Sequence, residues 1–325
     1  MTIETITLSG VLPENAIGSR LDQAISELFP EYSRSKLKEW LLAGNITVDG
    51  VVITKPREKV LGGELIQIEA EKKVEVKAPA QPIELNIVYE DEDILVINKP
   101  ANLVVHPGAG NPAGTILNAL LHHYPQIEQV PRAGIVHRLD KDTTGLMVVA
   151  KNLTAQTSLV AQLQEKIVTR EYEAVVNGTM TAGGIADYPI GRHPTKRTIQ
   201  AVVPEGKPAV THFRVAEKYR AHTRLRLRLE TGRTHQIRVH MAHLKHPLVG
   251  DFSYGGRVRP PKAADEIVID TLRAFRRQAL HAAILELEHP ATGEWMQFEA
   301  PVPEDMVNLS SVLRDDTKKH GLKDY

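Results

Sequence analysis

Residues 131–150 read PRAGIVHRLDKDTTGLMVVA, a stretch in which a charged loop lies between two apolar segments. The loop places seven polar side chains within eight positions: His137, Arg138, Asp140, Lys141, Asp142, Thr143 and Thr144. The apolar run 146–150 predicts a strand that would anchor the loop against a rigid core. Loops held in this way often carry function, although a charged turn between strands is the simpler interpretation of the pattern.

The segments on either side of this loop predict an α+β domain. Short runs, many of them β-branched and several alternating, predict strands at 87–89, 94–98, 146–150, 172–176, 212–216, 225–230 and 236–239. Helical periodicity is found at 116–123, 155–165 and 270–281. Strands therefore outnumber helices, and we expect an extended, mixed and largely antiparallel sheet.

A smaller α+β unit precedes this domain. Residues 20–50 read RLDQAISELFPEYSRSKLKEWLLAGNITVDG, with apolar side chains at helical spacing on both sides of Pro30. The pattern predicts two short helices, the second ended by Gly44, and then a hairpin that turns at Asp49-Gly50. Three cations of the second helix are expected to face solvent: Arg34, Lys36 and Lys38. Together with Lys55, Arg57 and Lys59, which follow the hairpin, they would form a compact cationic patch.

The boundaries of the two domains follow from composition. Residues 70–82 read AEKKVEVKAPAQP, which loses apolar periodicity and gains lysine, glutamate and proline, as linkers do. We therefore expect one domain at 1–75, a linker at 76–82 and a larger domain at 83–325. Residues 305–325 begin with a helical pattern and then become polar, so we expect the end of the chain to fray.

Charge is unevenly distributed along the chain. Its 40 Lys and Arg balance 40 Asp and Glu, but residues 192–240 hold twelve Lys and Arg against three Glu, a net charge of +9. This stretch favours a polyanionic partner, although a solvated strand face with counter-charges from elsewhere would have the same composition.

The absence of cysteine excludes disulfides, thiolate nucleophiles and cysteine-built metal sites. No apolar run reaches the roughly 18 residues that a membrane span requires, and residues 1–10 lack a signal-peptide pattern. We expect a cytoplasmic, monomeric protein without a membrane partner.

A second polar segment lies at 229–243 and reads LETGRTHQIRVHMAH. The Thr231-Gly232 turn would present Arg233 and His235 on one face at the start of a strand. A guanidinium at that place could pair with a carboxylate from another loop and keep it ionised, although a phosphate contact or a surface ion pair would use the same residue type. The histidines match no zinc-site spacing, so a metal site is less supported.

Two further segments have weaker signals. Residues 168–176 read VTREYEAVV, a predicted strand in which Tyr172 could place its ring against a planar base, although buried tyrosine is more often core. Lys99-Pro100 and the following 104–110 resemble a glycine-rich phosphate loop but lack the spacings of nucleotide-binding motifs, so we expect no nucleotide cofactor.

Four strings in this order resemble the motifs of large-subunit ribosomal RNA pseudouridine synthases of the RluA type. They are HRLDKDTTGLMVVAK at 137–151, REYEAVV at 170–176, TGRTHQIRVHMAH at 231–243 and HPLVGDFSYGG at 246–256. The front unit resembles the S-four-like RNA-binding domain, so the resemblance covers nearly the whole chain. It implies a pseudouridine synthase fold behind that domain, and large-subunit ribosomal RNA or the assembling large subunit as the partner.

The resemblance also implies roles for individual residues. Asp140 matches the family's essential aspartate nucleophile. Tyr172 matches the tyrosine that stacks on the uracil ring and is a candidate for proton removal. Arg233 matches the arginine that forms an ion pair with the aspartate, and Arg138 matches the side chain that fills the gap left by the flipped nucleotide.

The isomerisation of uridine is compatible with these residue types and needs no metal or other cofactor. The bond from ribose to a ring nitrogen breaks, the uracil rotates, and it rejoins the ribose through carbon five. Asp140 could attack the sugar, attack the ring or remove a ribose proton, and the sequence does not distinguish these routes. Flipping the base costs a few kcal/mol, which RNA contacts must offset. Further substrate or RNA contacts are expected from His137, Leu229, Arg34, Lys36 and Lys38.

Two other functions remain open from the sequence alone. One is an RNA-binding ribosome assembly factor in which the charged loop is only structural. The other is a hydrolytic nucleosidase, which would need a second carboxylate. Asp142 is the only nearby candidate, and we interpret it as a turn residue.

Overall fold

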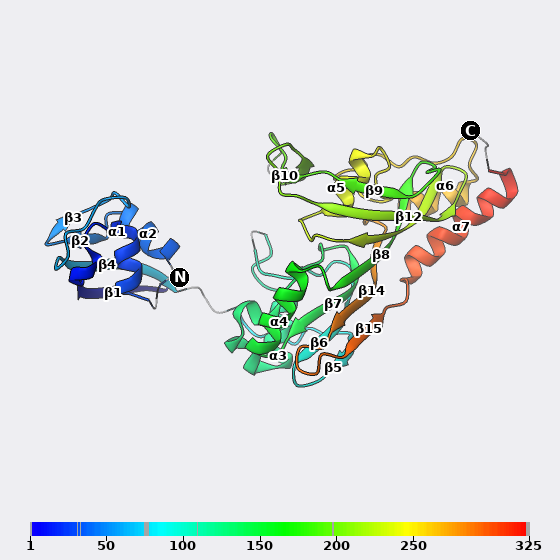
Figure 1. The fold of residues 1–325 in the computed structure, drawn as a ribbon. Helices are drawn as coiled ribbons and strands as arrows, with labels where there is room; N and C mark the ends of the chain where they lie inside the picture. The colour runs from blue at the N-terminus through cyan, green and yellow to red at the C-terminus, as the bar shows by residue number, and fades with distance from the viewer. Residues whose placement is uncertain are drawn as a thin grey trace. The chain divides into compact units, whose positions relative to one another are not determined.

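The computed structural model describes residues 2–30, 32, 34–74, 78–108, 110–196 and 198–322. The chain forms two compact units, Met1–Lys77 and Ala78–Tyr325 (Figure 1). Each unit has a hydrophobic core of its own.

The smaller unit is an antiparallel sheet covered by two helices. Its elements are β1 (Thr2–Val11), α1 (Leu21–Leu28), α2 (Arg34–Leu42), β2 (Ile46–Val48), β3 (Val51–Val52) and β4 (Leu65–Val74). The sheet order is β1-β4-β2-β3. Both predicted helices and the hairpin are confirmed, and Asp49 and Gly50 adopt positive φ angles of 49° and 80°, as a tight hairpin turn requires. The sequence did not predict the two long strands β1 and β4.

The larger unit is built on a nine-stranded sheet, ordered β5-β6-β7-β14-β8-β13-β12-β9 with β15 paired to β14. The strands are β5 (Ile87–Glu90), β6 (Ile94–Lys99), β7 (Thr144–Ala150), β8 (Thr169–Asn177), β9 (Gly184–Asp187), β12 (Val210–Lys218), β13 (His222–Leu229), β14 (Leu280–Glu288) and β15 (Trp295–Glu299). All pairs are antiparallel except β7 with β14. The predicted α+β class and mixed, largely antiparallel sheet are therefore confirmed.

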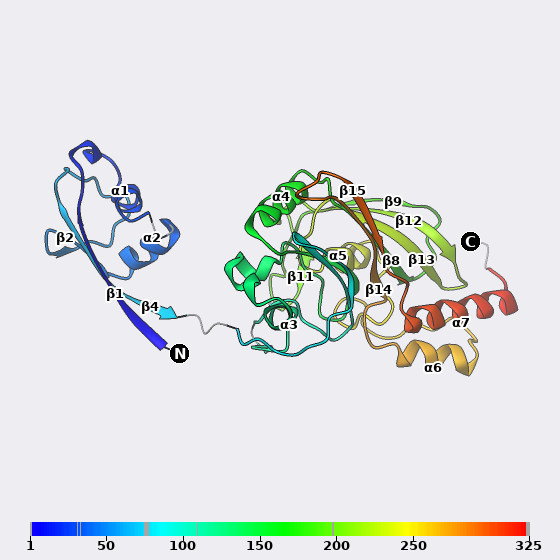
Figure 2. The same cartoon turned by 90° about the horizontal axis from the view of Figure 1, so that it is seen from below.

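Five α-helices accompany this sheet in the described part of the larger unit. They are α3 (Ile116–His123), α4 (Leu153–Gln164), α5 (Gln236–His243), α6 (Glu266–Ala274) and α7 (Glu304–His320). A separate two-stranded ribbon pairs β10 (Ile190–Arg192) with β11 (Gln200–Val202). Figure 2 shows α6 and α7 side by side at one edge of the unit.

The parallel pair of β7 and β14 requires a glycine. Gly145 lies opposite Ala282 with a φ of 112°, and a Cβ on Gly145 would lie 2.2 Å from the Ala282 carbonyl oxygen. Only glycine permits so close an approach in this conformation. The strand that follows the charged loop is thereby fixed in the centre of the sheet.

The prediction of a strand at 236–239 was wrong, because this segment is the start of α5. The Gln236 side chain accepts from Thr231 Oγ1 and Arg233 N, and donates to the Val210 carbonyl and to Thr211 Oγ1. These bonds fold the chain back at the end of β13. A short apolar run does not distinguish helix from strand, and contacts with β12 decide the outcome here.

The predicted helix at 270–281 was correct only at its start. Helix α6 ends at Ala274, and β14 begins at Leu280, where residues pair with β8 and β7. The buried sheet position of this segment overrides its helical periodicity.

The end of the chain is also more ordered than its polarity indicates, because α7 continues to His320. Arg220 donates to both oxygens of Asp316 at 2.8 and 2.7 Å, and both side chains are buried. Arg220 N also donates to Thr317 Oγ1. A polar face of α7 is therefore attached to the sheet domain by a buried ion pair.

Replacing Asp316 by Asn should lower the free energy of unfolding by about 3 kcal/mol, because it leaves a buried guanidinium without a carboxylate. The matched control is Asp315→Asn, which removes an exposed carboxylate whose one ion pair among the described residues is with Lys318. It should change stability by less than about 0.5 kcal/mol. Urea unfolding of both variants measures the difference. Equal stability of the two would contradict this account of α7.

Candidate active site

A cavity of about 630 Å³ opens beside the charged loop of the larger unit. Its walls come from the loop, β8, the end of β13 and the start of α5. Five guanidinium groups line it: Arg132, Arg138, Arg170, Arg233 and Arg238. Among the described lining residues, Asp140 is the only Asp or Glu. The cavity thus combines a single carboxylate with a strongly cationic wall.

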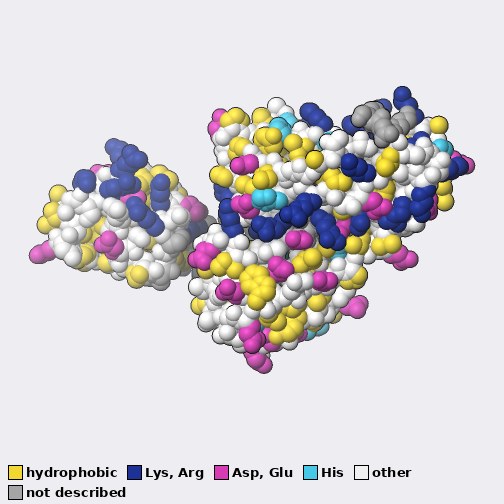
Figure 3. Space-filling model, turned by 45° about the vertical axis from the view of Figure 1, so that its right-hand side comes forward, with side chains coloured by type: hydrophobic (Ala, Val, Ile, Leu, Met, Phe, Trp, Pro, Cys, Tyr) yellow, Lys and Arg dark blue, Asp and Glu magenta, His cyan; other side chains and the backbone are white. Residues whose placement is uncertain are grey.

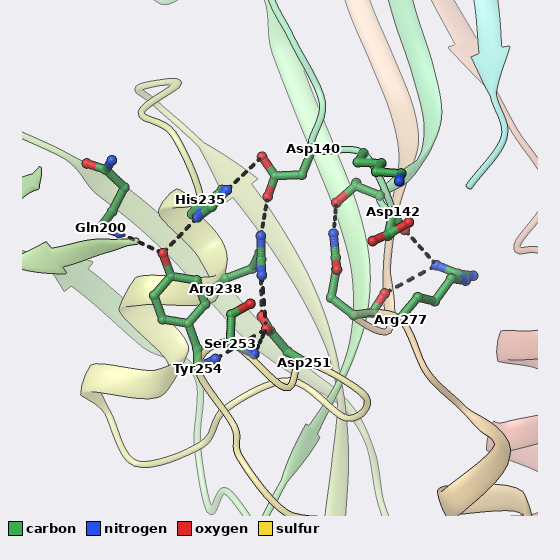
Figure 4. A network of polar contacts seen from close by, with 12 residues as sticks. Asp140, Asp142, Gln200, His235, Arg238, Asp251, Ser253, Tyr254 and Arg277 are labelled. Atoms are coloured by element: carbon green, nitrogen blue, oxygen red, sulfur yellow. Dashed lines mark hydrogen bonds and ion pairs between the residues drawn. The ribbon is translucent and has the colours of Figure 1, made fainter. Parts of the chain in front are cut away.

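The Asp140 carboxylate is oriented by two side chains at the start of α5. Arg238 donates from Nη1 to Oδ2 at 3.0 Å, and His235 Nε2 lies 3.9 Å from Oδ1 (Figure 4). Thr143 N donates to the backbone carbonyl of Asp140 at 3.1 Å. The side chain keeps 14% of its surface exposed. It is a fixed carboxylate with one side open to the cavity.

Arg238 is itself held by a second carboxylate. Its Nε and Nη2 donate to Asp251 at 2.6 and 2.9 Å, and Asp251 also accepts the N–H groups of Ser253 and Tyr254. Burial opposes the charge of Arg238, but hydrogen bonds and charge from Asp251, with a further contribution from Asp140, raise its pKa above the ordinary value. Arg238 is therefore a permanent cation between two carboxylates.

His235 and Tyr254 complete this network. The Tyr254 ring lies beneath the Arg238 guanidinium, with Cζ 4.9 Å from the ring centroid, and its hydroxyl is 2.7 Å from His235 Nδ1. Gln200 N donates to the same hydroxyl at 2.9 Å. Burial lowers the pKa of His235, although Asp140 partly opposes this effect. A neutral imidazole therefore faces Asp140 at neutral pH.

Tyr172 lines the cavity from β8 and is 5% exposed. Burial raises the pKa of its phenol; Arg170 opposes this shift, and Asp140 adds to it. The residue is thus an uncharged aromatic surface at neutral pH. This state suits packing against a planar ring better than removal of a proton, which requires a phenolate.

Arg170 lies two positions before Tyr172 on the same strand face. It is 7% exposed, its Nε lacks a hydrogen-bond partner among the described residues, and burial lowers its pKa. Buried guanidinium groups are normally paired with an acceptor. At the wall of this cavity, Arg170 can donate to an oxygen of a bound ligand.

The other predicted substrate-contact residues also line the cavity. Arg138 is exposed, Leu229 is buried, and His137 is half-buried. His137 Nε2 accepts from Val148 N at 3.1 Å, and burial, with the charge of Arg170, lowers its pKa to about 3. A neutral His137 therefore ties the charged loop to β7.

The loop is further anchored by Lys99, which the sequence had associated with a phosphate loop. Lys99 is 1% exposed and donates to the carbonyls of Pro100, Leu103 and Lys141. Burial lowers its pKa to about 7. Its ammonium group therefore holds backbone immediately after Asp140 and does not face the cavity.

The ion pair expected for Arg233 is made by Arg238. Arg233 lines the cavity but donates to the Pro208 carbonyl, and no described carboxylate pairs with it. Because α5 begins at Gln236, Arg238 lies on the helical turn that faces Asp140. A helical interpretation of 236–243 would have identified Arg238 as a candidate. Asp251 and Tyr254 lie in the fourth motif string, where sequence spacing gave no role to single residues.

The second carboxylate considered earlier, Asp142, does not line the cavity. Its backbone carbonyl accepts from Arg277 at 3.4 Å. The arrangement therefore presents one carboxylate to a ligand, in contrast to the two that glycoside hydrolysis requires.

The described residues include one cluster with metal-ligand types, Asp91, Asp93 and His289. His289 Nε2 lies 2.8 Å from Asp91 Oδ2, and Asp91 Oδ1 accepts the N–H groups of Asp93 and Ile94. These bonds show that the three side chains stabilise a turn of the backbone.

Among the described residues, none of the helices is both long and apolar enough to cross a membrane.

In the smaller unit, the three predicted cations of α2 have different neighbours. Arg34 donates to Asp22 at 2.9 Å, whereas Lys36 pairs with Glu39 and lies over the Trp40 ring. Lys38 lines a separate open hollow of about 530 Å³, whose other cations are Arg20, Lys55 and Arg57. Lys55 and Arg57, which the sequence placed in the same patch as Lys38, therefore line this hollow beside it.

Comparison with known proteins agrees with this geometry. Residues 93–243 match the RNA pseudouridylate synthase family, and residues 19–66 match the S4 domain. The chain is 65% identical over 321 residues to ribosomal large subunit pseudouridine synthase D of Vibrio vulnificus (strain CMCP6), with 99% of both chains covered. It is 64% identical over 317 residues to the protein of that name from Escherichia coli (strain K12), covering 98% of this chain and 97% of the relative.

Solved structures give the same result for the larger unit. Human RNA pseudouridylate synthase domain containing 4 superposes with a TM-score of 0.55 at 26% identity, covering 70% of this chain and 93% of that one. Human RNA pseudouridylate synthase domain containing 1 superposes with a TM-score of 0.54 at 27% identity. The match covers 72% of this chain and 89% of that one. The chain therefore belongs to the RNA pseudouridine synthase family and groups with the relatives named ribosomal large subunit pseudouridine synthase D.

Proposed function

We propose that this pseudouridine synthase uses Asp140 as its nucleophile or base to isomerise uridines of large-subunit ribosomal RNA. The observation that carries the assignment is the single carboxylate of the cavity, held at 3.0 Å by Arg238 and open to solvent on one side. One positioned carboxylate is sufficient for attack on the sugar, attack on the ring or removal of a ribose proton. A nucleosidase would need a second one.

The cavity residues have three tasks in this proposal. Arg238 pairs with Asp140 and orients it, because Arg238 is itself fixed by Asp251. The Tyr172 ring packs against the uracil, which must remain bound after it leaves the ribose and while it rotates. Arg138, exposed at the rim, occupies the place that the flipped nucleotide leaves in the RNA.

The remaining cationic wall supports binding of the RNA backbone around the flipped nucleotide. His137 and Leu229 shape the inner wall, one as a neutral acceptor tied to β7 and the other as an apolar side chain. We propose that the protein acts as a monomer, in which Asp140, Arg238 and Tyr172 line one cavity. We place the reaction in the cytoplasm, where ribosomal RNA of assembling subunits would be available.

In the smaller unit, we propose that the hollow around Lys38 and Lys55 adds RNA affinity without taking part in the chemistry. Arg34 contributes less than the sequence indicated, because Asp22 accepts from it and also from Arg20. Lys36 is expected to contact RNA from the same helix as Lys38.

We propose that the chain divides by function into an RNA-binding domain at 1–75, a linker at 76–82 and a catalytic domain at 83–325.

Replacement of Asp140 by Asn should abolish pseudouridine formation, because an amide is neither nucleophile nor base. The measurement is a pseudouridine map of unmodified large-subunit ribosomal RNA, or of nascent subunits, after incubation with each protein. Retained RNA binding by the variant is the control for folding. Pseudouridine formed by the variant at the wild-type rate would refute the assignment.

The two arginines of the second polar segment should differ in effect. Arg238→Gln should lower kcat by roughly 100-fold, since it releases the reacting carboxylate from its geometry. Arg233→Gln removes the same charge from the same cavity and should mainly raise KM. Single-turnover kinetics on one RNA substrate separates these effects. A larger loss of kcat in Arg233→Gln than in Arg238→Gln would indicate that Arg233, and not Arg238, orients Asp140 during the reaction.

The double variant Lys38→Gln/Lys55→Gln should weaken RNA binding and leave kcat at saturating RNA unchanged. The matched control is Lys318→Gln/Lys319→Gln, which removes two exposed charges of α7. The slope of log Kd against log salt concentration should also fall by about one for each phosphate contact that is lost. Unchanged affinity and salt dependence would exclude the hollow from RNA binding.

A further inference from the structure

A second and larger hollow, of about 920 Å³, lies on the opposite face of the sheet from the active site. Successive side chains of a strand point to opposite faces. Leu225, Leu227 and Leu229 of β13 are buried and Leu229 lines the active-site cavity, whereas the alternating Arg224, Arg226 and Arg228 line the hollow on the other face. We call this hollow the back groove; its charged and histidine lining is Glu171, His212, Arg214, Arg224, Arg226 and Arg228.

The back groove concentrates positive charge at some cost to the sheet. Arg214 of β12 lies directly opposite Arg226 of β13, and His212 lies opposite Arg228. Like charges at directly paired positions destabilise an antiparallel sheet. On the other side of β13, Arg226 lies opposite Glu173 and Arg228 opposite Glu171 of β8, which offsets part of this cost. A merely solvated face could carry uncharged polar side chains at these positions without that cost.

Acidic neighbours neutralise only part of the groove. Arg224 and Arg226 both pair with Glu173 at 3.2 Å, and Arg224 also lies 3.4 Å from Glu217.

At the other end of the groove, Glu230 is shared by Lys166 and His212. No ion pair forms between the remaining arginines, Arg214 and Arg228, and any carboxylate of the part of the chain that the structure describes. Both are exposed. Figure 3 shows Lys and Arg side chains in a row across the hollowed middle of one face of the larger unit.

We propose that the back groove binds the phosphate backbone of a second segment of the ribosomal RNA, distinct from the segment that enters the active site. Guanidinium groups bind phosphate oxygens in bidentate geometry, which suits exposed arginines in a regular array. The sheet backbone separates the groove from the cavity, so a nucleotide at Asp140 cannot touch Arg214 or Arg228. The inference rests on the proposed function, because it takes the same RNA as the partner.

The occupant follows from charge complementarity with a substrate that is itself a polyanion. A short hairpin that fills only the active site would not reach the opposite face. A large folded RNA would reach both faces around the edge of the sheet at β9. The groove would then favour structured, full-length substrate over an isolated target loop.

The test uses the full chain with Arg214→Gln/Arg228→Gln, and its matched control is Arg273→Gln/Arg276→Gln, which removes two exposed arginines outside the groove. Kd is measured between 50 and 200 mM salt for unmodified large-subunit ribosomal RNA and for a short hairpin that contains one target uridine in its unmodified form. The groove variant should bind the long RNA more weakly, with a salt slope smaller by about one per lost phosphate contact. Its Kd for the hairpin, and kcat on both RNAs, should equal those of the wild type.

A third variant, Arg214→Lys/Arg228→Lys, retains the charge and should keep most of the salt slope, which separates phosphate binding from a change in folding. An unchanged slope on the long RNA would overturn the proposal and favour an acidic protein surface as the occupant. An equal loss of affinity for both RNAs would also overturn the proposal. The effect would then arise from the overall electrostatic field of the protein and not from phosphate contacts in the groove. If the wild-type protein formed pseudouridine in neither RNA, the proposed function itself would be refuted.

Discussion

The guanidinium of Arg238 is the group on which the active site depends. A buried cation needs anionic partners, and Arg238 has two, Asp251 behind it and Asp140 in front. Because Asp251 is fixed by backbone N–H groups of its own loop, the cation cannot follow a movement of Asp140. The charged loop, the start of α5 and the loop that holds Asp251 are therefore coupled through one side chain, and a displacement of any of them costs a buried ion pair.

The sheet contributes a second constraint, because the alternation of strand side chains separates two chemistries. On one face, β8 and β13 supply Tyr172, Arg170 and Leu229 to the cavity. On the other face, the same strands supply arginines and glutamates to the back groove. The highly cationic stretch of the sequence is thus divided between two surfaces. Its net charge alone could not reveal that division, since successive residues of a strand contribute to different faces.

Much of the fold was predictable where the signal is local. Six strand segments, the helix at 116–123, the first hairpin and the turn at Asp49-Gly50 all follow from periodicity and turn chemistry. The errors fall where a contact distant in sequence decides. Residues 236–239 became a helix because Gln236 bonds to β12, and the polar end of α7 is ordered because Arg220 meets Asp316. Neither partner is visible within a short window of sequence.

The sequence by itself determined the fold class, the family and the placement of Asp140, since a charged loop ahead of a buried strand and four ordered motifs need no knowledge of distant contacts. Only the tertiary structure decided which cation serves that carboxylate. Arg233 and Arg238 occupy the same motif and have the same chemistry, but the helix that begins at Gln236 turns Arg238 toward Asp140 and leaves Arg233 at the Pro208 carbonyl. The choice depends on how β12, β13 and α5 pack together, and that packing joins residues far apart in the chain.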